Sequence, residues 1–187
     1  MNWWQIITTI LGSSTISTVI TYFLNRRFNN KKLHAEIVSK ARIDWINEFR
    51  NLSSKYLYEV YRSIELKKIE IEAQNYMLHS KNASVEYLRY RKKSEEYSKL
   101  YNESFSNMTK ASIQLRLYLP KRTRSSEQIE HKNIKEKIDF INNELNKVED
   151  KTNNHILETL EKDTLLKLTD YIARYLKTEW EKAKNKR

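Results

Sequence analysis

The chain has no cysteine and only one glycine and one proline in 187 residues. Without cysteine, disulfides and thiolate metal sites are excluded. Tight turns between strands draw heavily on glycine and proline, so the sequence predicts a fold that is helical almost throughout. Phosphate-binding loops, which depend on a glycine-rich backbone, are excluded by the same shortage.

Groups that carry catalysis or hold a metal are also scarce. The four histidines are widely separated, and none has a glutamate three residues before it, the spacing that di-iron sites in helical bundles use. Arg124 precedes His131, and Arg27 precedes His34, with six residues between them, as in some helical ribonucleases. With 12 arginines and four histidines, such a spacing arises by chance. We therefore predict no metal, no cofactor and no enzymatic activity.

The one long uncharged stretch is WWQIITTILGSSTISTVITYFL, residues 3–24. As a helix it would span about 33 Å, close to the hydrocarbon thickness of a bilayer, and it has aromatic residues at both ends. A signal peptide has positive charges before its apolar stretch, whereas here they follow it. The sequence predicts a single transmembrane helix in a cell membrane, with an anchor over residues 1–25. Positive charge favours the cytoplasmic side, so we expect the N-terminus outside and a cytoplasmic domain over residues 26–187.

The polar residues of this stretch lie on one face of the predicted helix. Small residues let membrane helices approach closely, and hydroxyls can hydrogen-bond between helices. The pattern therefore predicts self-association into a homo-oligomer, and a pore lined by hydroxyls is a further alternative. The other alternative is that the hydroxyls hydrogen-bond only within their own helix and do not promote association. The residues concerned recur every four positions, with the only glycine beside them: Thr9, Ser13, Ser17, Thr21 and Gly12.

Four helices with an apolar residue at every third or fourth position follow. The first is predicted to run to about Leu78, continuous with the span, and "HSKNAS" then gives a turn with a cap at Ser84. The second should stop at Leu119, because the next residue is proline. The third begins at Ser125 or Ser126, and the fourth follows "EDKTNN". The fold class predicted is all-α: one transmembrane helix and an elongated antiparallel bundle of about four long helices.

The expected core follows from the same periodicity. On the first helix, Leu33, Ile37 and Ala41 begin the apolar face, and the face of the second begins with Val85 and Leu88. The third helix should bury Ile134, Ile138, Ile141, Leu145 and Val148. Trp45, Phe49 and Trp180 are predicted as core anchors where the first and fourth helices meet, with Arg42 and Arg50 as flanking salt-bridge formers.

The net charge of +11 is concentrated in clusters. In an up-and-down bundle, the loop after the second helix would return to the bilayer, where each basic residue contributes about 1 kcal/mol toward an anionic surface. The predicted anionic lipid contacts are therefore Arg26, Arg27, Lys31, Lys32, Lys121, Arg122 and Arg124. The alternative is that these charges only aid solubility.

A further basic cluster, YLRYRKK, opens the second helix at residues 87–93. Basic side chains interleaved with tyrosine can grip phosphates and stack on bases, but an ordinary solvated helix face has the same composition. The candidate nucleic-acid contacts are Arg89, Arg91, Lys92 and Lys93.

Three stretches, KARIDWINEFRNL (residues 40–52), IQLRLYLP (residues 113–120) and YLKTEWEKAK (residues 175–184), resemble small single-span proteins of unassigned function from bacterial and prophage genomes. In that group an asparagine usually precedes the loop proline, where this chain has Leu119. The resemblance implies a membrane helix, a helical cytoplasmic part and a setting in conflict between cells and phages. It supplies no catalytic residue.

Three hypotheses about function follow. The first is a non-enzymatic, membrane-anchored, self-associating helical protein that acts by binding an unknown protein partner or by perturbing the membrane, with phage defence as the setting. The second is a membrane-tethered nucleic-acid-binding protein. The third is a purely structural membrane tether.

Overall fold

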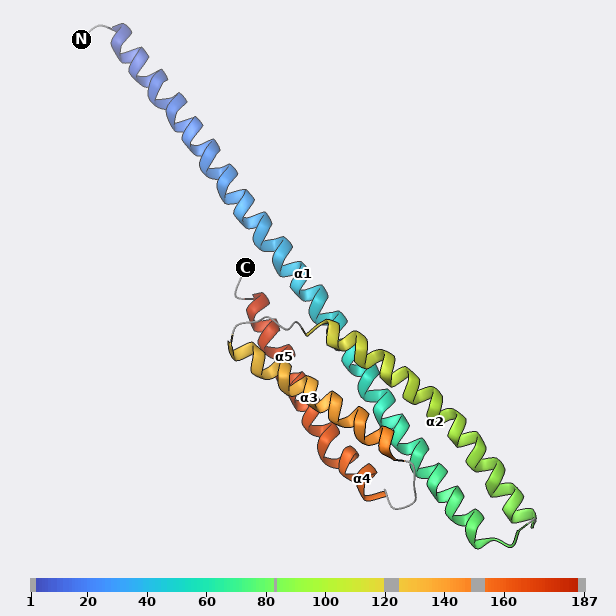
Figure 1. The fold of residues 1–187 in the computed structure, drawn as a ribbon. Helices are drawn as coiled ribbons and strands as arrows, with labels where there is room; N and C mark the ends of the chain where they lie inside the picture. Colours follow the sequence, from blue (N-terminus) through green and yellow to red (C-terminus); the bar gives the residue numbers. More distant parts are fainter. Residues whose placement is uncertain (1–2, 83, 120–124, 149–153, 185–187) are drawn as a thin grey trace. The chain divides into compact units, whose positions relative to one another are not determined.

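The computed structural model describes the backbone of residues 3–82, 84–119, 125–148 and 154–184, and the side chains of residues 21–22, 24–82, 84–119, 129–148 and 155–184. Every regular element in these ranges is helical (Figure 1): α1 (Trp3–His79), α2 (Val85–Leu117), α3 (Ser125–Lys147), α4 (Asn154–Thr159), the π-helical segment η2 (Leu160–Leu165) and α5 (Leu166–Lys184). No strand occurs within them, which confirms the all-α prediction.

The helices begin and end close to the predicted positions. α1 ends at His79, beside the predicted Leu78, and it runs from Trp3 without a break, as expected for a helix without an internal proline. Ser84 caps α2, and its hydroxyl accepts a hydrogen bond from the amide of Tyr87 at 3.1 Å. This bond satisfies one of the free amides that every helix start exposes.

The chain divides into two compact units. The first comprises Met1–Trp45 with Glu179–Arg187, and the second comprises Ile46–Thr178. The domain boundary predicted at residue 25 stays a prediction.

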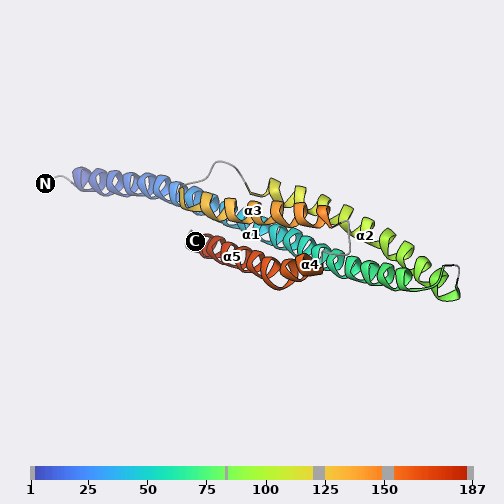
Figure 2. The ribbon, with the colours of Figure 1, turned by 60° about the horizontal axis from the view of Figure 1, so that its bottom comes forward.

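Within the unit Ile46–Thr178, α1 and α2 form an antiparallel hairpin. Ser63 hydrogen-bonds to Ser104, and farther along α1 the ring of Tyr76 stacks on that of Tyr90, which lies earlier on α2. The two helices therefore run in opposite directions, and Figure 2 shows α2 lying along the second half of α1. This part of the predicted topology is confirmed by the contacts.

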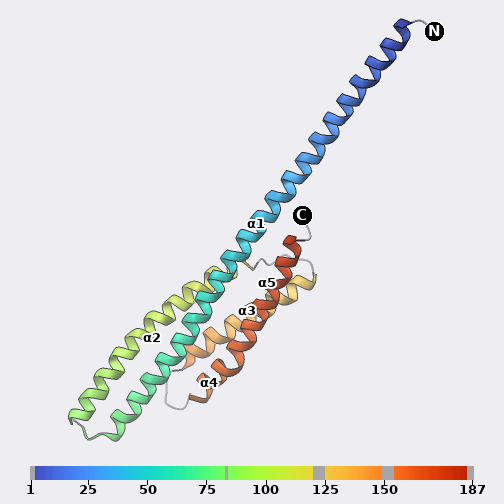
Figure 3. The ribbon, with the colours of Figure 1, turned by 180° about the vertical axis from the view of Figure 1, so that it is seen from behind.

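The remaining helices of this unit pack against the hairpin. α3 lies along α2, where Tyr101 donates a hydrogen bond to the carbonyl of Leu145 at 3.0 Å. α3 and α5 lie side by side, as Figure 3 shows from behind, and His131 meets the hydroxyl of Tyr175 at 2.7 Å. Phe49 of α1 contacts the same tyrosine ring edge-on. α1 thus contacts both α2 and α5 in this unit.

On α1 and α3 of this unit a set of buried positions follows a heptad pattern, which is the spacing that keeps one seam of a helix against its neighbours. On α3 the five predicted core residues, Ile134, Ile138, Ile141, Leu145 and Val148, are all buried. On α1 the pattern is just as regular, but half of its members are polar: Ile46, Phe49, Ser53, Tyr56, Val60, Ser63, Lys67 and Glu70.

Several predicted core residues are exposed instead. Val85 and Leu88 expose 85% and 55% of their surface, because they lie on the side of α2 away from the seam that Tyr101, Met108 and Leu115 bury. Trp180 is 38% exposed, since the buried residues of α5 here are Glu179 and Ala183. Leu33, Ile37 and Ala41 are exposed as well.

In the unit Met1–Trp45 with Glu179–Arg187, the end of α5 packs on α1. Arg42 forms the predicted salt bridge, with its Nε 3.5 Å from a carboxylate oxygen of Glu179. Ser39 donates a hydrogen bond to the carbonyl of Ala183 at 3.2 Å. Arg50, which belongs to the other unit, donates to the side-chain amide oxygen of Asn47 at 3.4 Å, so the salt bridge predicted for it is replaced by a neutral acceptor.

Among the residues that the structure describes, no helix combines the length and the apolar character that crossing a bilayer requires. The span predicted for residues 3–24 is therefore not confirmed.

Candidate functional site

The first part of α1 whose side chains are described, residues 21–43, combines exposed apolar and cationic groups. Exposed apolar side chains occur on several sides of the helix: Tyr22, Leu24, Phe28, Leu33, Ile37 and Val38. The basic residues Arg26, Arg27, Lys31 and Lys32 are also exposed, and none of the four has a carboxylate within ion-pair distance among the described residues. We call residues 22–38 the basic apolar segment.

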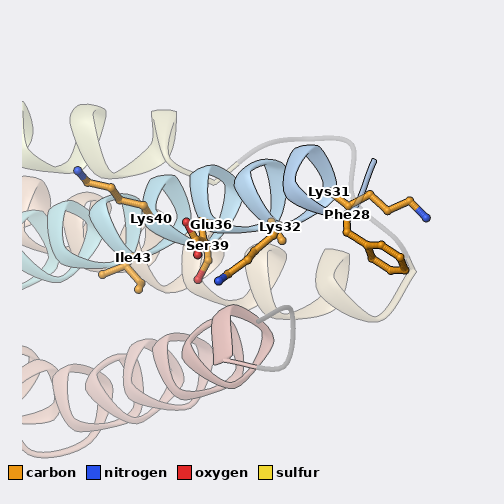
Figure 4. Close-up of a pocket in the computed structure, with 8 residues that line it drawn as sticks. Phe28, Lys31, Lys32, Glu36, Ser39, Lys40 and Ile43 are labelled. Atoms are coloured by element: carbon orange, nitrogen blue, oxygen red, sulfur yellow. The ribbon is translucent and has the colours of Figure 1, made fainter. Parts of the chain in front are cut away.

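Residues of the basic apolar segment line two hollows. One has a volume of about 800 Å³ and is lined by residues of α1 from Phe28 to Ile43, with Ala35 and Ser39 between them. Figure 4 shows Lys32, Glu36 and Ser39 close together on one side of the helix, and Lys40 pointing another way.

The second hollow has a volume of about 660 Å³ and is lined by Leu24, Arg26, Arg27, Asn30, Lys31 and His34. In both hollows the apolar stems of long basic side chains line the wall, and their charged ends remain in solvent. This combination suits an amphiphile with an anionic head group, because the stems contact apolar chains and the charged ends contact phosphate.

The remaining residues predicted to contact lipid or to self-associate are only partly described. Lys121, Arg122 and Arg124 lie outside the described residues, and for Thr9, Gly12, Ser13 and Ser17 only the helical backbone is described. Thr21 is described and is exposed. The predicted approach of the 121–124 loop to the bilayer therefore stays a prediction.

The four candidate nucleic-acid contacts lie at the outer end of the α1–α2 hairpin. Arg89, Arg91 and Lys92 are exposed and Lys93 is half-buried. Arg91 pairs with Glu95 at 3.0 Å, and the ammonium of Lys93 lies 5.8 Å from the ring centroid of Tyr97. Among the described residues Arg89 and Lys92 have no ion-pair partner, so these two are available to an external anion.

A buried polar cluster between α1 and α2 was missed by the sequence analysis. Ser104 donates a hydrogen bond to a carboxylate oxygen of Glu59 at 2.8 Å, and Ser63 donates to the hydroxyl of Ser104 at 3.0 Å. The guanidinium of Arg62 is 4.0 Å from the same carboxylate. The sequence could have predicted this cluster, because these polar residues occupy heptad positions at which a buried apolar residue would be expected.

One heptad step farther along α1, Lys67 and Glu70 form a buried ion pair at 3.2 Å. The ammonium of Lys67 also lies 5.0 Å from the ring centroid of Tyr101. Burial, and then the carboxylate of Glu70, raise the pKa of Tyr101 to about 12. This tyrosine is consequently a hydrogen-bond donor at neutral pH and does not act as a base.

Lys68, on the neighbouring side of α1, binds two carboxylates. Its ammonium is 2.5 Å from Glu161 of η2 and 2.9 Å from Glu65. Partial burial acts to lower the pKa of Lys68, but the hydrogen bonds to Glu161 and Glu65 outweigh it, and the pKa is raised. The lysine stays charged and ties α1 to the π-helical segment.

The residues of the buried clusters pair with one another. In the described part of the chain, no group of three histidine, aspartate or glutamate side chains lies close enough to hold a metal ion.

Comparisons with family models, with curated proteins and with solved structures found no match to this chain.

Proposed function

We propose that the protein is a non-enzymatic, membrane-anchored helical protein that self-associates and presents its bundle to a protein partner on the cytoplasmic side. In this proposal residues 3–24 cross the membrane and the basic apolar segment contacts anionic lipid head groups. The resemblance to prophage-encoded single-span proteins suggests phage defence as the setting.

One observation supports the proposal most strongly. α1 continues as one helix from Trp3 into a segment where exposed apolar side chains alternate with unpaired cations, and this is the composition found at the inner boundary of a membrane. A helix that faces only water would not be expected to expose this many apolar side chains, because they favour association.

Cysteine labelling tests the anchoring, and the absence of native cysteine makes the background clean. Asn2→Cys reports on the N-terminus, and Val85→Cys reports on the bundle, where Val85 is 85% exposed. In intact spheroplasts a membrane-impermeant maleimide should label Asn2→Cys at once and Val85→Cys only after permeabilisation. The reverse order, or extraction of the protein by alkaline carbonate, would refute the proposed topology.

Lipid retention tests the basic apolar segment separately. Protein reconstituted with equal phosphatidylglycerol and phosphatidylcholine, then purified in mild detergent, should retain more of the anionic lipid. Replacing Arg26, Arg27, Lys31 and Lys32 by glutamine should abolish this preference, since each charge contributes about 1 kcal/mol. The matched control replaces the four basic residues at 89, 91, 92 and 93. Equal effects of both quadruple variants would mean that only net charge matters.

The mass of the full chain in mild detergent tests self-association. A discrete oligomer that Gly12→Leu and Ser13→Leu dissociate would support the proposed helix contact. A monomer would leave a tethered bundle without self-association.

A further inference from the structure

The outer end of the α1–α2 hairpin, residues 71–97, is the least covered part of the unit Ile46–Thr178. Among the described residues, no hydrogen bond, ion pair or ring contact joins this end to α3, η2 or α5. The last such links are those of Lys68 to Glu161 and of Tyr101 to Leu145. Figures 1 and 3 show the hairpin extending past α3 and α4 at this end.

Apolar side chains are concentrated at this uncovered end. Tyr76, Leu78, Val85 and Leu88 expose 51%, 57%, 85% and 55% of their surfaces. A groove of about 320 Å³ between the two helices, lined by Gln74, Met77, Leu78, Tyr87, Arg91, Ser94 and Glu95, opens on another side of α2, because Val85 is about 200° around the helix from Tyr87. Clusters of exposed apolar residues with a polar rim are typical of sites where another protein binds.

The rim of this surface is basic. Residues 81–99 contain six basic and three acidic side chains. One of the three acidic groups, Glu95, already pairs with Arg91 at 3.0 Å. Arg89 and Lys92 have no ion-pair partner among the described residues, so the charge offered to an incoming molecule is positive.

We propose that the outer end of the hairpin binds an acidic, amphipathic helix of a protein partner, with its apolar face on Val85 and Leu88 and its carboxylates toward Arg89 and Lys92, which share one face of α2. An amphipathic helix that packs its apolar face on an exposed apolar surface is a common mode of peptide recognition. The carboxylates of the partner helix are complementary in charge to the basic rim, and this complementarity speeds association.

Two other occupants fit less well. A nucleic acid would use stacking surfaces, but Tyr76 and Tyr90 already stack on each other, with ring centroids 5.0 Å apart and an interplanar angle of 16°. It would also leave the aliphatic side chains of Val85 and Leu88 exposed. A second copy of the same surface would bring two basic rims together, and like charges in contact oppose association.

This inference deepens the proposed function, because it places the partner-binding site on the bundle. The two fail in different ways. If cysteine labelling confirms the anchoring and the hairpin binds no acidic helix, only this inference is refuted. If the protein is not anchored, the hairpin surface is unaffected and can still be tested.

The experiment measures binding of fluorescent peptides to the full chain in nanodiscs of zwitterionic lipid by fluorescence anisotropy. The probe is a 20-residue peptide with leucine on one helical face and glutamate on the other. One matched peptide has the same composition in scrambled order, and a second has lysine in place of glutamate. The acidic amphipathic peptide should bind at least tenfold more tightly than either.

Surface variants then locate the site. Leu88→Ser should weaken binding of the acidic peptide about tenfold, because one buried leucine contact is lost. Leu117→Ser is the control on the same helix, since Leu117 is 79% exposed. Val85→Ser repeats the test at a residue with almost no packing role, and thermal melts confirm that each variant is folded.

Charge variants test the rim in the same assay. Replacing Arg89 and Lys92 by glutamine should weaken binding about threefold at low salt, and less at high salt, as for exposed charges at an interface. Glutamine at Lys110 and Lys177, both exposed and elsewhere in this unit, is the matched control.

Several results would overturn the inference. Equal binding of the acidic, scrambled and lysine peptides would remove its basis. Binding of a single-stranded oligonucleotide that needs Arg89 and Lys92, with no peptide binding, would assign the surface to nucleic acid. Dimerisation that Leu88→Ser abolishes would assign it to a second copy.

Discussion

Ser104→Ala is expected to weaken the bundle more than its small size suggests. The hydroxyl of Ser104 lies 2.8 Å from a carboxylate oxygen of Glu59, a residue that is only 7% exposed. The guanidinium of Arg62 is 4.0 Å away and its side chain is 34% exposed, so it does not replace the lost donor. The substitution therefore leaves a buried charge without its closest partner.

The magnitude follows from the kind of hydrogen bond removed. A hydrogen bond to a charged group contributes about 1.5–3 kcal/mol, and Ser104→Ala should lower the free energy of unfolding by that amount. Ser63→Ala removes only the bond between two hydroxyls and should cost about 0.5–1.5 kcal/mol. Replacing Glu59 by Met together with Ser104→Ala removes both partners and should recover most of the loss, since apolar replacement of a buried polar pair is often neutral.

The assay is urea denaturation of the full chain in mild detergent, followed by circular dichroism at 222 nm. The three variants are compared at equal slope, so that differences in midpoint report stability. If Ser104→Ala costs no more than Ser63→Ala, then the carboxylate of Glu59 is satisfied by water, and the reasoning from its burial is wrong.

Three further predictions use the same assay. Phe49→Ala removes a fully buried ring that meets Tyr175 edge-on at 5.4 Å, and it should cost about 3–5 kcal/mol, whereas Phe49→Leu should cost clearly less. Ser84→Ala removes the cap of α2 and should cost about 1 kcal/mol; an unchanged midpoint would mean that water replaces the cap. Burial and Glu70 hold the pKa of Tyr101 at about 12, above the value of about 10 in an unfolded chain, so the contribution of this group is complete below pH 10 and is lost as the pH rises to 12. Tyr101→Phe should make the decline between about pH 10 and 12 shallower, and a decline identical to that of the unsubstituted chain would contradict the assignment.

The helices and most of the central core were predictable from the sequence. The sequence has only one proline and one glycine, so few places can interrupt a helix. The side chain of Ser84 can cap a helix, and this indicated where α2 begins. On α3 the five predicted core residues are all buried, because that helix has neighbours along its whole apolar face.

The exposed apolar residues were not predictable in the same way. Periodicity shows which side of a helix is apolar but not whether another helix covers it. Val85 and Leu88 lie away from the side of α2 that Tyr101, Met108 and Leu115 bury, and they are therefore exposed. Leu33 and Ile37 on α1 are exposed for the same reason, because Ser39 and Ile46 define the packed side there.

The polar core was hidden for a different reason. Ser63, Lys67 and Glu70 occupy heptad positions of α1, but a search for apolar residues passes over them. Their burial depends on partners from other parts of the chain, such as Ser104 and Tyr101, and no local pattern reveals those pairings.

The π-helical segment η2 determines where the chain tolerates the deletion of one residue. A π-helical turn contains one residue more than the helix around it needs, and here the buried residues Leu160, Thr164, Leu168 and Ile172 are each four positions apart. Deleting an exposed residue of this segment, such as Lys162, would leave a step of three between Leu160 and Thr164, and an ordinary α-helix would then keep every later side chain on its present side. A deletion within α5 would instead turn all later residues by about 100°. The helix formed by α4, η2 and α5 can therefore lose a residue from η2 without losing its alignment with the rest of the bundle.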